Sequence, residues 1–335
     1  MGSALKEQAL GKKEKEPKAK LRARHEGVLV ITLFALPKAF RGHFELIQRN
    51  AITSWTRLSP KPEIILFGNE DGTADIARQL GLRHVPEVRR SEYGTPMVND
   101  LFEKGQELAT RGILCYVNSD ILLLSDFVKA VKRVASWRNR FLMVGRRTNL
   151  DIEQLQDFDS AECEPRLQRL ASEKGIPGKP AAIDYFVFTR GLYPSIPAFA
   201  LGRTAWDNWL IWRARTSKTP VVDASAVITV IHQNHGYLDR PEGKDWVKLG
   251  EEAMRNRNIA GKEKRYSLAN ATHLLTPQGI QWNGNHLFLK KELALPSWAL
   301  APLAITLGVR RRLGLDRESL AKLADLLGRI GMTRV

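Results

Sequence analysis

The sequence predicts an α/β domain built on a mostly parallel β-sheet with helices on both of its faces. Short apolar runs rich in valine and isoleucine alternate with amphipathic segments through the first half of the chain, joined by short links. A continuous apolar run is typical of a strand buried on both faces, and strand–helix alternation is typical of a parallel sheet. Polar residues follow the fourth apolar run, at the edge where such sheets bind ligands.

The first half of the chain contains four predicted strands and three predicted helices. The strands are expected at 28–34, 63–68, 83–85 and 113–117, and the helices at 44–58, 73–80 and 96–111. Gly68, Gly81 and Gly112 stand at the ends of these elements, where glycine commonly stops a helix or a strand.

The pattern continues less regularly through the second half. Elements are expected as a helix at 127–138, a strand at 141–145, a helix near 164–174, a strand at 183–189, a tryptophan-rich helix at 204–214, and strand-like runs at 221–223 and 226–232. Regularity falls beyond Arg265, before an amphipathic helix at 316–330. We expect a disordered basic tail over 1–26, one domain over 27–270 and a C-terminal extension over 271–335.

The bulk composition limits the partners and the compartment. The 335 residues have a formal net charge of +16, which favours anionic partners without choosing among them. A nucleic-acid-binding protein is the less favoured class, because the basic residues are dispersed and no nucleic-acid motif is present. Two cysteines without a CxxC spacing, no secretory signal and no long uncharged apolar run lead us to expect a cytoplasmic protein. The helix at 316–330 either packs on the domain or attaches peripherally to anionic lipid at the inner face of the membrane.

Asp120 stands where a ligand is expected, because it follows the predicted strand 113–117 through Asn118 and Ser119. A carboxylate beside an amide and a hydroxyl suits a hard divalent cation, since Mg²⁺ and Mn²⁺ take oxygen ligands and often share them with phosphates. By itself this triplet is a weak signal, because similar turns cap helices in many proteins.

Blocks of sequence around and after Asp120 resemble one family. The run YVNSDILL at 116–123 resembles the DxD signature of GT-A fold, family-2-like glycosyltransferases, in a variant whose first Asp is Asn118. Later blocks that resemble the same group are FLMVGRR (141–147), IDYFVF (183–188), GRTAWDNWL (202–210) and IHQNHGY (231–237). The resemblance spans roughly 28–270. It implies a GT-A type, mostly parallel Rossmann-like sheet and the activity of a nucleotide-diphospho-sugar transferase.

The resemblance also implies a metal site. In that fold the last Asp of the DxD and a C-terminal His hold the cation, which here would be Asp120 and His232, with His235 as the alternative. The expected cofactor is a divalent cation, Mn²⁺ or Mg²⁺. Asn118 in place of Asp predicts weaker or water-mediated contact with the metal, and Gly236 stands where the group often has an Asp.

Asp207 resembles the catalytic base of inverting GT-A enzymes, because it lies at a predicted helix start between Trp206 and Trp209. Desolvation by neighbouring tryptophans would raise the pKa of its carboxyl and make it a better base. The alternative is that the tryptophans are core anchors and that Asp207 stabilises the helix dipole.

Further residues are candidates for substrate contacts. Those expected to contact the nucleotide are Glu70, Asn99, Asn118, Ser119 and Arg146. Those expected to contact the acceptor are Asp184, Trp206, Trp209 and His235, since tryptophan faces stack on sugar rings. For Asp184, which interrupts an apolar run, a buried ion pair is the open alternative.

The sequence thus predicts a glycosyltransferase that moves a sugar from a UDP- or GDP-sugar donor to a carbohydrate or lipid-linked acceptor, with inversion. A catalytically silent module of the same fold that only binds a glycan or a partner is the alternative, since a fold does not fix a function. No GxGxxG follows the first strand, which excludes the usual dinucleotide-binding motif.

Overall fold

The computed structural model describes residues 30–236, 247–262 and 264–284. Its strands are β1 (Thr32–Ala35), β2 (Glu63–Phe67), β3 (Arg83–Val85), β4 (Ile113–Val117), β5 (Ile121–Leu123), β6 (Leu142–Val144), β7 (Thr148–Leu150), β8 (Ile176–Pro177), β9 (Tyr185–Thr189), β10 (Val221–Asp223), β11 (Val230–Gln233), β12 (His273–Thr276) and β13 (Gly279–Trp282). Its helices are α2 (Gly42–Thr56), α3 (Thr73–Leu80), α4 (Val98–Leu108), α5 (Ser125–Trp137), α6 (Cys163–Lys174), α7 (Trp206–Thr216), α9 (Glu251–Ala260) and the short 3-10 helix η2 (Leu268–Asn270).

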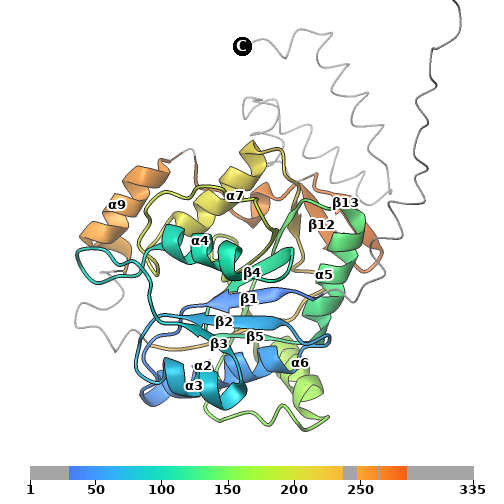
Figure 1. Ribbon diagram of the computed structural model, residues 1–335. Coiled ribbons are helices and arrows are strands. Elements are labelled where there is room, and N and C mark those ends of the chain that lie inside the picture. The colour runs from blue at the N-terminus through green and yellow to red at the C-terminus, as the bar shows by residue number, and fades with distance from the viewer. Residues whose placement is uncertain (1–29, 237–246, 263, 285–335) are drawn as a thin grey trace, which may run out of the picture.

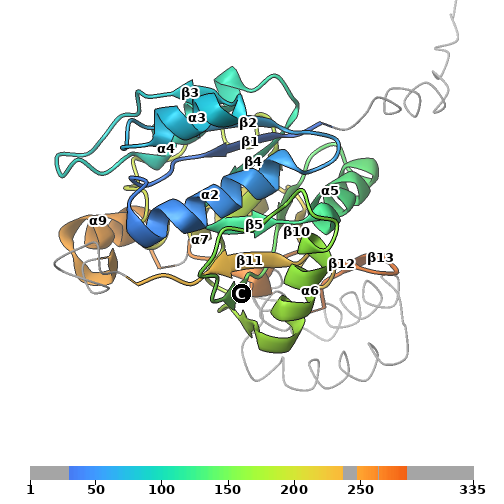
Figure 2. The same cartoon turned by 90° about the horizontal axis from the view of Figure 1, so that it is seen from below.

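A nine-stranded sheet forms the centre of the domain, in the order β13-β12-β10-β6-β9-β4-β1-β2-β3 (Figure 1). Five of its eight strand pairs are parallel, and the antiparallel pairs are those of β9 with β4 and β6 and that of β12 with β13. A second sheet, β5-β11-β7-β8, lies beside α2, which packs on β5 (Figure 2). The predicted fold class, α/β with a mostly parallel sheet, is confirmed.

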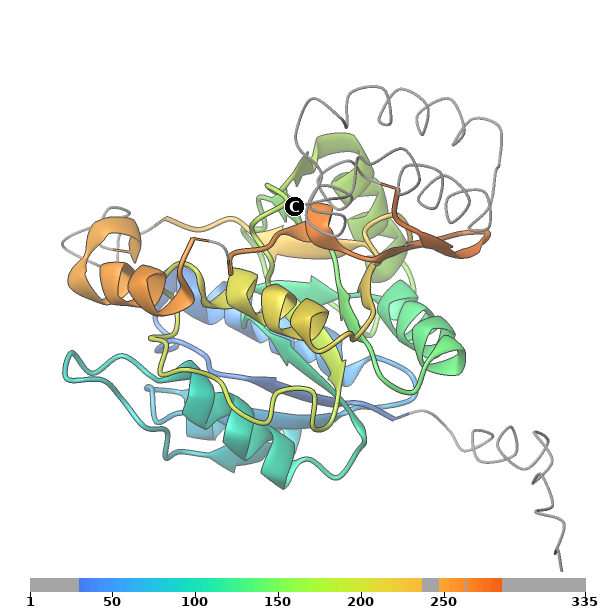
Figure 3. The same cartoon turned by 90° about the horizontal axis from the view of Figure 1, so that it is seen from above.

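Helices cover both faces of the large sheet, because successive side chains of its strands point to opposite faces. In β4, Cys115 and Val117 join the core formed with α2, α3, α5 and α6, whereas Leu114 and Tyr116 join the core formed with α4 and α7. Figure 3 shows α4 and α7 together on the second of these faces. A strand with cores on both sides needs apolar residues at nearly every position, which explains the continuous apolar runs.

Most predicted elements agree with the structure. The helix 73–80 and the strands 83–85, 113–117 and 221–223 have the predicted bounds. The strands β5, β7 and β8, of two or three residues each, were not predicted; runs this short show no period of their own. Regularity was expected to fall beyond Arg265, and no strand was predicted there, but β12 and β13 follow this residue and extend the sheet.

The predicted domain boundary at Asn270 falls just before β12, so the last two strands of the sheet lie on its C-terminal side. The division into domains stays a prediction. The tail at 1–26 and the amphipathic helix at 316–330 lie outside the described residues. Among the helices that the structure describes, none is both long enough and apolar enough to cross a membrane.

Candidate active site

Asp120 lies in the turn between β4 and β5, at the carboxyl end of β4. The strand β5 pairs with β11 in an antiparallel register that places His232 opposite Ile121, the residue after Asp120. Backbone hydrogen bonding continues this pairing, since the Gln233 N–H donates to the Asp120 carbonyl at 3.2 Å. The strand pairing therefore brings two segments that are more than 100 residues apart to the same point.

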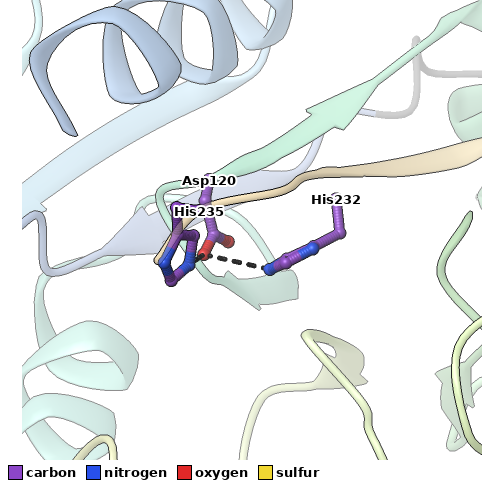
Figure 4. Close-up of side chains that lie close together, drawn as sticks. All are labelled: Asp120, His232 and His235. Carbon is purple, nitrogen blue, oxygen red and sulfur yellow. Dashed lines mark hydrogen bonds and ion pairs between the residues drawn. The ribbon is translucent and has the colours of Figure 1, made fainter. Parts of the chain in front are cut away.

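Three potential metal ligands converge there: Asp120, His232 and His235 (Figure 4). The Nε2 atom of His235 lies 3.1 Å from Asp120 Oδ2, and that of His232 lies 3.5 Å from the same oxygen. One ligand atom from each residue lies within 4.8 Å of the others, and no second cluster of this kind occurs among the described residues. The sequence predicted that Asp120 and His232 hold the cation, with His235 as the alternative to His232. The structure places both histidines near Asp120.

Electrostatics couple the three side chains. Burial would raise the pKa of Asp120, but the charge and hydrogen bonding of His232 and His235 outweigh it and hold that pKa well below its ordinary value. For His235, burial works to lower the pKa, and the hydrogen bond and charge of Asp120 raise it instead. The carboxylate form of Asp120 is therefore strongly favoured, as a cation site needs.

The chemistry of this cluster fits a divalent cation. Asp120 Oδ1 is buried and has no hydrogen-bond partner in the structure. Buried polar atoms are normally paired, so a carboxylate oxygen that has no protein partner beside two imidazoles suits contact with a metal ion. One carboxylate and two imidazoles suit Mn²⁺ and other first-row metals better than Mg²⁺, which prefers oxygen ligands throughout.

Gln233 holds the histidine-bearing strand in place, and the sequence reading gave it no role. It is fully buried, and its amide donates to the Ile47 carbonyl at 2.7 Å and accepts from Asn50 at 3.0 Å. These bonds join β11 to α2 at Gln233, the residue directly after His232. No sequence signal marks such a residue, because its partners are distant in the chain.

Asp207 lies in the first turn of α7. Ala205, the residue just before this helix, has a φ of +86°. Trp206 anchors this turn, with its ring centroid 5.4 Å from that of Tyr116. Burial and the negative charge of Asp184 raise the pKa of Asp207 to about 7. Its Oδ1 atom is buried without a hydrogen-bond partner. The predicted desolvation of this carboxyl is therefore present, and a pKa near neutrality suits a general base.

Tyr116, on β4, is close enough to Asp120 and Asp207 for the charges of both to act on its phenol. Burial raises the pKa of its phenol, and the charges of Asp120, Asp184 and Asp207 raise it further. The hydroxyl itself donates to Asn118 Oδ1 at 2.8 Å. The sequence reading assigned no role to Tyr116, which looked like an ordinary strand residue.

Asp184 and Asn118 are joined by hydrogen bonds. The amide of Asn118 donates to Asp184 Oδ1 at 2.9 Å, and Arg147 donates to both oxygens of Asp184 at 2.9 Å. Asp184 is only 6% exposed. Its contacts favour the buried ion pair that was the open alternative, and its contact with an acceptor stays a prediction.

The remaining predicted nucleotide contacts lie around the strand ends. Glu70 follows β2 and pairs with Arg90 at 2.7 Å, while its Oε2 atom is buried without a partner. Asn99 Oδ1, at the start of α4, and Ser119 Oγ are also buried without partners. Arg146 is exposed, and its side chain donates to the Gly178 carbonyl. The roles of these four residues stay predictions.

Trp206 and Trp209 pack inside the protein. Their exposed fractions are 5% and 6%, and Trp209 packs on Phe199 with ring centroids 5.6 Å apart. Their burial favours the core-anchor alternative over stacking on an acceptor sugar. A run of tryptophans beside a charged residue cannot distinguish these two roles in sequence, because both need large aromatic rings.

Lys38 follows β1 and lies near the cluster of Asp120, His232 and His235. Its ammonium lies 3.9 Å from the ring centroid of Phe44, whose ring in turn lies 5.0 Å from that of His235. The buried side chain of Gln48 fixes the Lys38 backbone, accepting from its N–H at 2.6 Å and donating to its carbonyl at 2.9 Å. The Lys38 ammonium is thus near enough to the cluster for its charge to act on His235.

Comparison with protein-family models finds no match, and neither does comparison with curated proteins. Weak similarity to solved structures is found. One is S. aureus TarS in complex with UDP-GlcNAc, at 10% identity and a TM-score of 0.43, over 62% of this chain and 59% of that chain. Another is glucosyl-3-phosphoglycerate synthase from Mycobacterium tuberculosis in complex with Mn²⁺, UDP and phosphoglyceric acid, at 18% identity and a TM-score of 0.42, over 73% and 81% of the two chains. The chain thus spans less than two thirds of the TarS chain, and its function rests on the geometry of its own site.

Proposed function

We propose that this protein is a glycosyltransferase that moves a sugar from a nucleoside-diphosphate sugar, with UDP or GDP as the nucleotide, to a hydroxyl of a carbohydrate or lipid-linked acceptor. The observation that carries the proposal is the convergence of Asp120, His232 and His235 at the carboxyl end of β4. Sheets of this type bind nucleotides at that edge, and a diphosphate leaving group requires a divalent cation or fixed positive charges.

Asp120, His232 and His235 would hold the cation. When bound, it neutralises the charge that develops on the diphosphate as the bond to the sugar breaks. The two imidazoles favour Mn²⁺ over Mg²⁺ in the metal-binding cluster. Lys38, fixed near His235, adds a positive charge on the same side.

Asp207 would act as the base. Its carboxylate removes the proton from the acceptor hydroxyl, whose oxygen then attacks the anomeric carbon of the donor sugar. The bond from that carbon to the diphosphate oxygen breaks, and the nucleoside diphosphate leaves with the bonding electron pair. The acceptor oxygen would attack from the face of the sugar opposite to the departing diphosphate. Such a single displacement inverts the configuration at the anomeric carbon.

The nucleotide would lie along the ends of β2 and β4. Glu70, Asn99 and Ser119 each present a buried polar atom without a protein partner, which is what a polar ligand needs. The ion pair of Arg90 with Glu70 would fix the carboxylate for contact with the base or ribose.

Thermal unfolding tests the proposal. The protein is incubated with UDP-, GDP- and CMP-sugars, with Mn²⁺ and with EDTA, and its melting temperature is measured. We expect one nucleotide series to stabilise the protein only when Mn²⁺ is present, and Asp120→Ala to abolish that shift, because a ligand that binds the native state raises its stability. The absence of a shift with every nucleotide would contradict the proposal. Binding without any release of nucleoside diphosphate would favour the catalytically silent module.

A further inference from the structure

Asn118 is held by three bonds within the protein. The hydroxyl of Tyr116 donates to Asn118 Oδ1 at 2.8 Å, and Asn118 Nδ2 donates to Asp184 Oδ1 at 2.9 Å. The Asn118 backbone N–H also donates to the carbonyl of Asp184 at 2.9 Å. Both ends of the amide are thus engaged by neighbours in the large sheet.

The register of the sheet causes this arrangement. In the antiparallel pair of β4 and β9, Val117 stands opposite Tyr185. One further step along each strand brings Asn118 opposite Asp184, so the two side chains meet at the strand ends. Arg147 completes the group by donating from one nitrogen to both oxygens of Asp184, each at 2.9 Å.

An amide is the side chain that this position requires. Its oxygen accepts from Tyr116 and its nitrogen donates to Asp184, and an ionised carboxylate can only accept. An aspartate at 118 would place two carboxylates within hydrogen-bond distance of each other, with Arg147 as the cation that pairs with Asp184. Like charges at that distance oppose each other strongly in a poorly solvated site.

We propose that Asn118 is a positioning residue that holds the Asp184–Arg147 pair at the carboxyl end of β4, and that it is not a ligand of the cation. The proposal rests on the proposed function, because it assigns the cation to Asp120, His232 and His235 alone. The asparagine in the DxD-like triplet is then an adaptation to the carboxylate of Asp184. It is not a weakened metal ligand.

The two roles predict opposite effects of Asn118→Asp. If Asn118 were a ligand, a carboxylate there would tighten Mn²⁺ binding, since carboxylates bind this ion better than amides. If Asn118 positions Asp184, the same variant gains repulsion, its melting temperature falls by several degrees in EDTA, and its Kd for Mn²⁺ is unchanged or weaker. Adding Asp184→Asn restores one amide and one carboxylate to the pair, so N118D/D184N should recover most of the lost melting temperature.

The experiment measures melting in EDTA and Mn²⁺ binding for wild type, N118D, D184N, N118D/D184N and Asn118→Ala. Asn118→Ala removes the hydrogen bonds without adding charge, so it keeps the test decisive if N118D does not fold. We expect N118A to melt lower than wild type and to bind Mn²⁺ within about twofold of it. A roughly tenfold loss of Mn²⁺ affinity in N118A, or a tighter Kd in N118D with unchanged melting, would overturn the proposal. If wild type binds neither Mn²⁺ nor a nucleotide, the proposed function fails, whereas the melting cycle still reports on the contact of Asn118 with Asp184.

Discussion

Glu252, which is buried, and Asp207, which is half-buried, are carboxylates on neighbouring helices, and their surroundings change their pKa values in opposite directions. On α9, Glu252 accepts from Ser91 at 2.5 Å and from Thr95 and Arg203 at 2.7 Å. Burial would raise the pKa of Glu252, but these hydrogen bonds and the charge of Arg203 lower it. On α7, which packs against α9, burial and the charge of Asp184 raise the pKa of Asp207 to about 7.

The difference is the one expected between a structural carboxylate and the base proposed for this site. Both oxygens of Glu252 have donors, so this residue ties α9 to the loop at 91–95 and to the segment before α7. Asp207 keeps a buried oxygen without a donor. A raised pKa together with a buried oxygen that lacks a donor is typical of functional sites, whereas a carboxylate with donors on both oxygens is typical of a structural contact.

Removing the carboxylate of Asp207 is expected to have the largest effect. Asp207→Asn should lower kcat/KM for transfer by about 10²–10⁴-fold, because an amide cannot accept the acceptor proton. The measurement is nucleoside diphosphate release in the presence of acceptor. Asp75→Asn is the matched control, since the Asp75 side chain is 74% exposed. Equal rates for D207N and wild type would remove Asp207 from the mechanism.

Glu252→Ala should instead act on stability. It leaves the Arg203 guanidinium buried without its carboxylate, and breaking such a pair costs about 3–5 kcal/mol in the free energy of unfolding. Urea unfolding measures the loss, and the neighbouring Glu251→Ala serves as the control, with a change of about 1 kcal/mol or less. A loss in E252A no greater than that in E251A would show that the pair is not a structural anchor.

The pH profile of transfer tests how Asp184 acts on Asp207. With a base whose pKa is about 7, kcat/KM should rise with pH through neutrality and level off above it. Asp184→Asn removes the negative charge that raises this pKa, so the rising limb should move to lower pH. A limb at the same pH in D184N and wild type would mean that Asp184 does not influence the base.

The smallest effect concerns the stability of D207N. The pKa of Asp207 is raised on folding, so the protonated form stabilises the native state below about pH 4, and this contribution is lost as pH rises through about 7. D207N has no such loss. Its melting temperature relative to wild type should therefore be higher at pH 8 than at pH 5. A constant difference across this range would contradict the raised pKa.

The sequence predicted the sheet and the position of Asp120 because both depend on local patterns. Continuous apolar runs indicate the buried strands, and polar residues directly after one run indicate its ligand-binding end. Asp207 and the histidines followed from resemblance, and the cluster containing both histidines needed the register of β5 with β11. Contacts such as those of Gln233 with Asn50 and of Asn118 with Asp184 join residues far apart in the chain. Such pairs depend on tertiary packing, and for that reason periodicity and spacing did not reveal them.

The central claim is that Asp120, His232 and His235 form a cation site that binds together with a nucleoside diphosphate. Electron paramagnetic resonance of free Mn²⁺ tests it directly, in titrations with wild type, Asp120→Asn and D207N, with and without UDP or GDP. We expect wild type and D207N to bind Mn²⁺, one nucleotide to tighten that binding, and Asp120→Asn to lose both effects. Undiminished Mn²⁺ binding by Asp120→Asn, or no binding by wild type with either nucleotide, would contradict the claim.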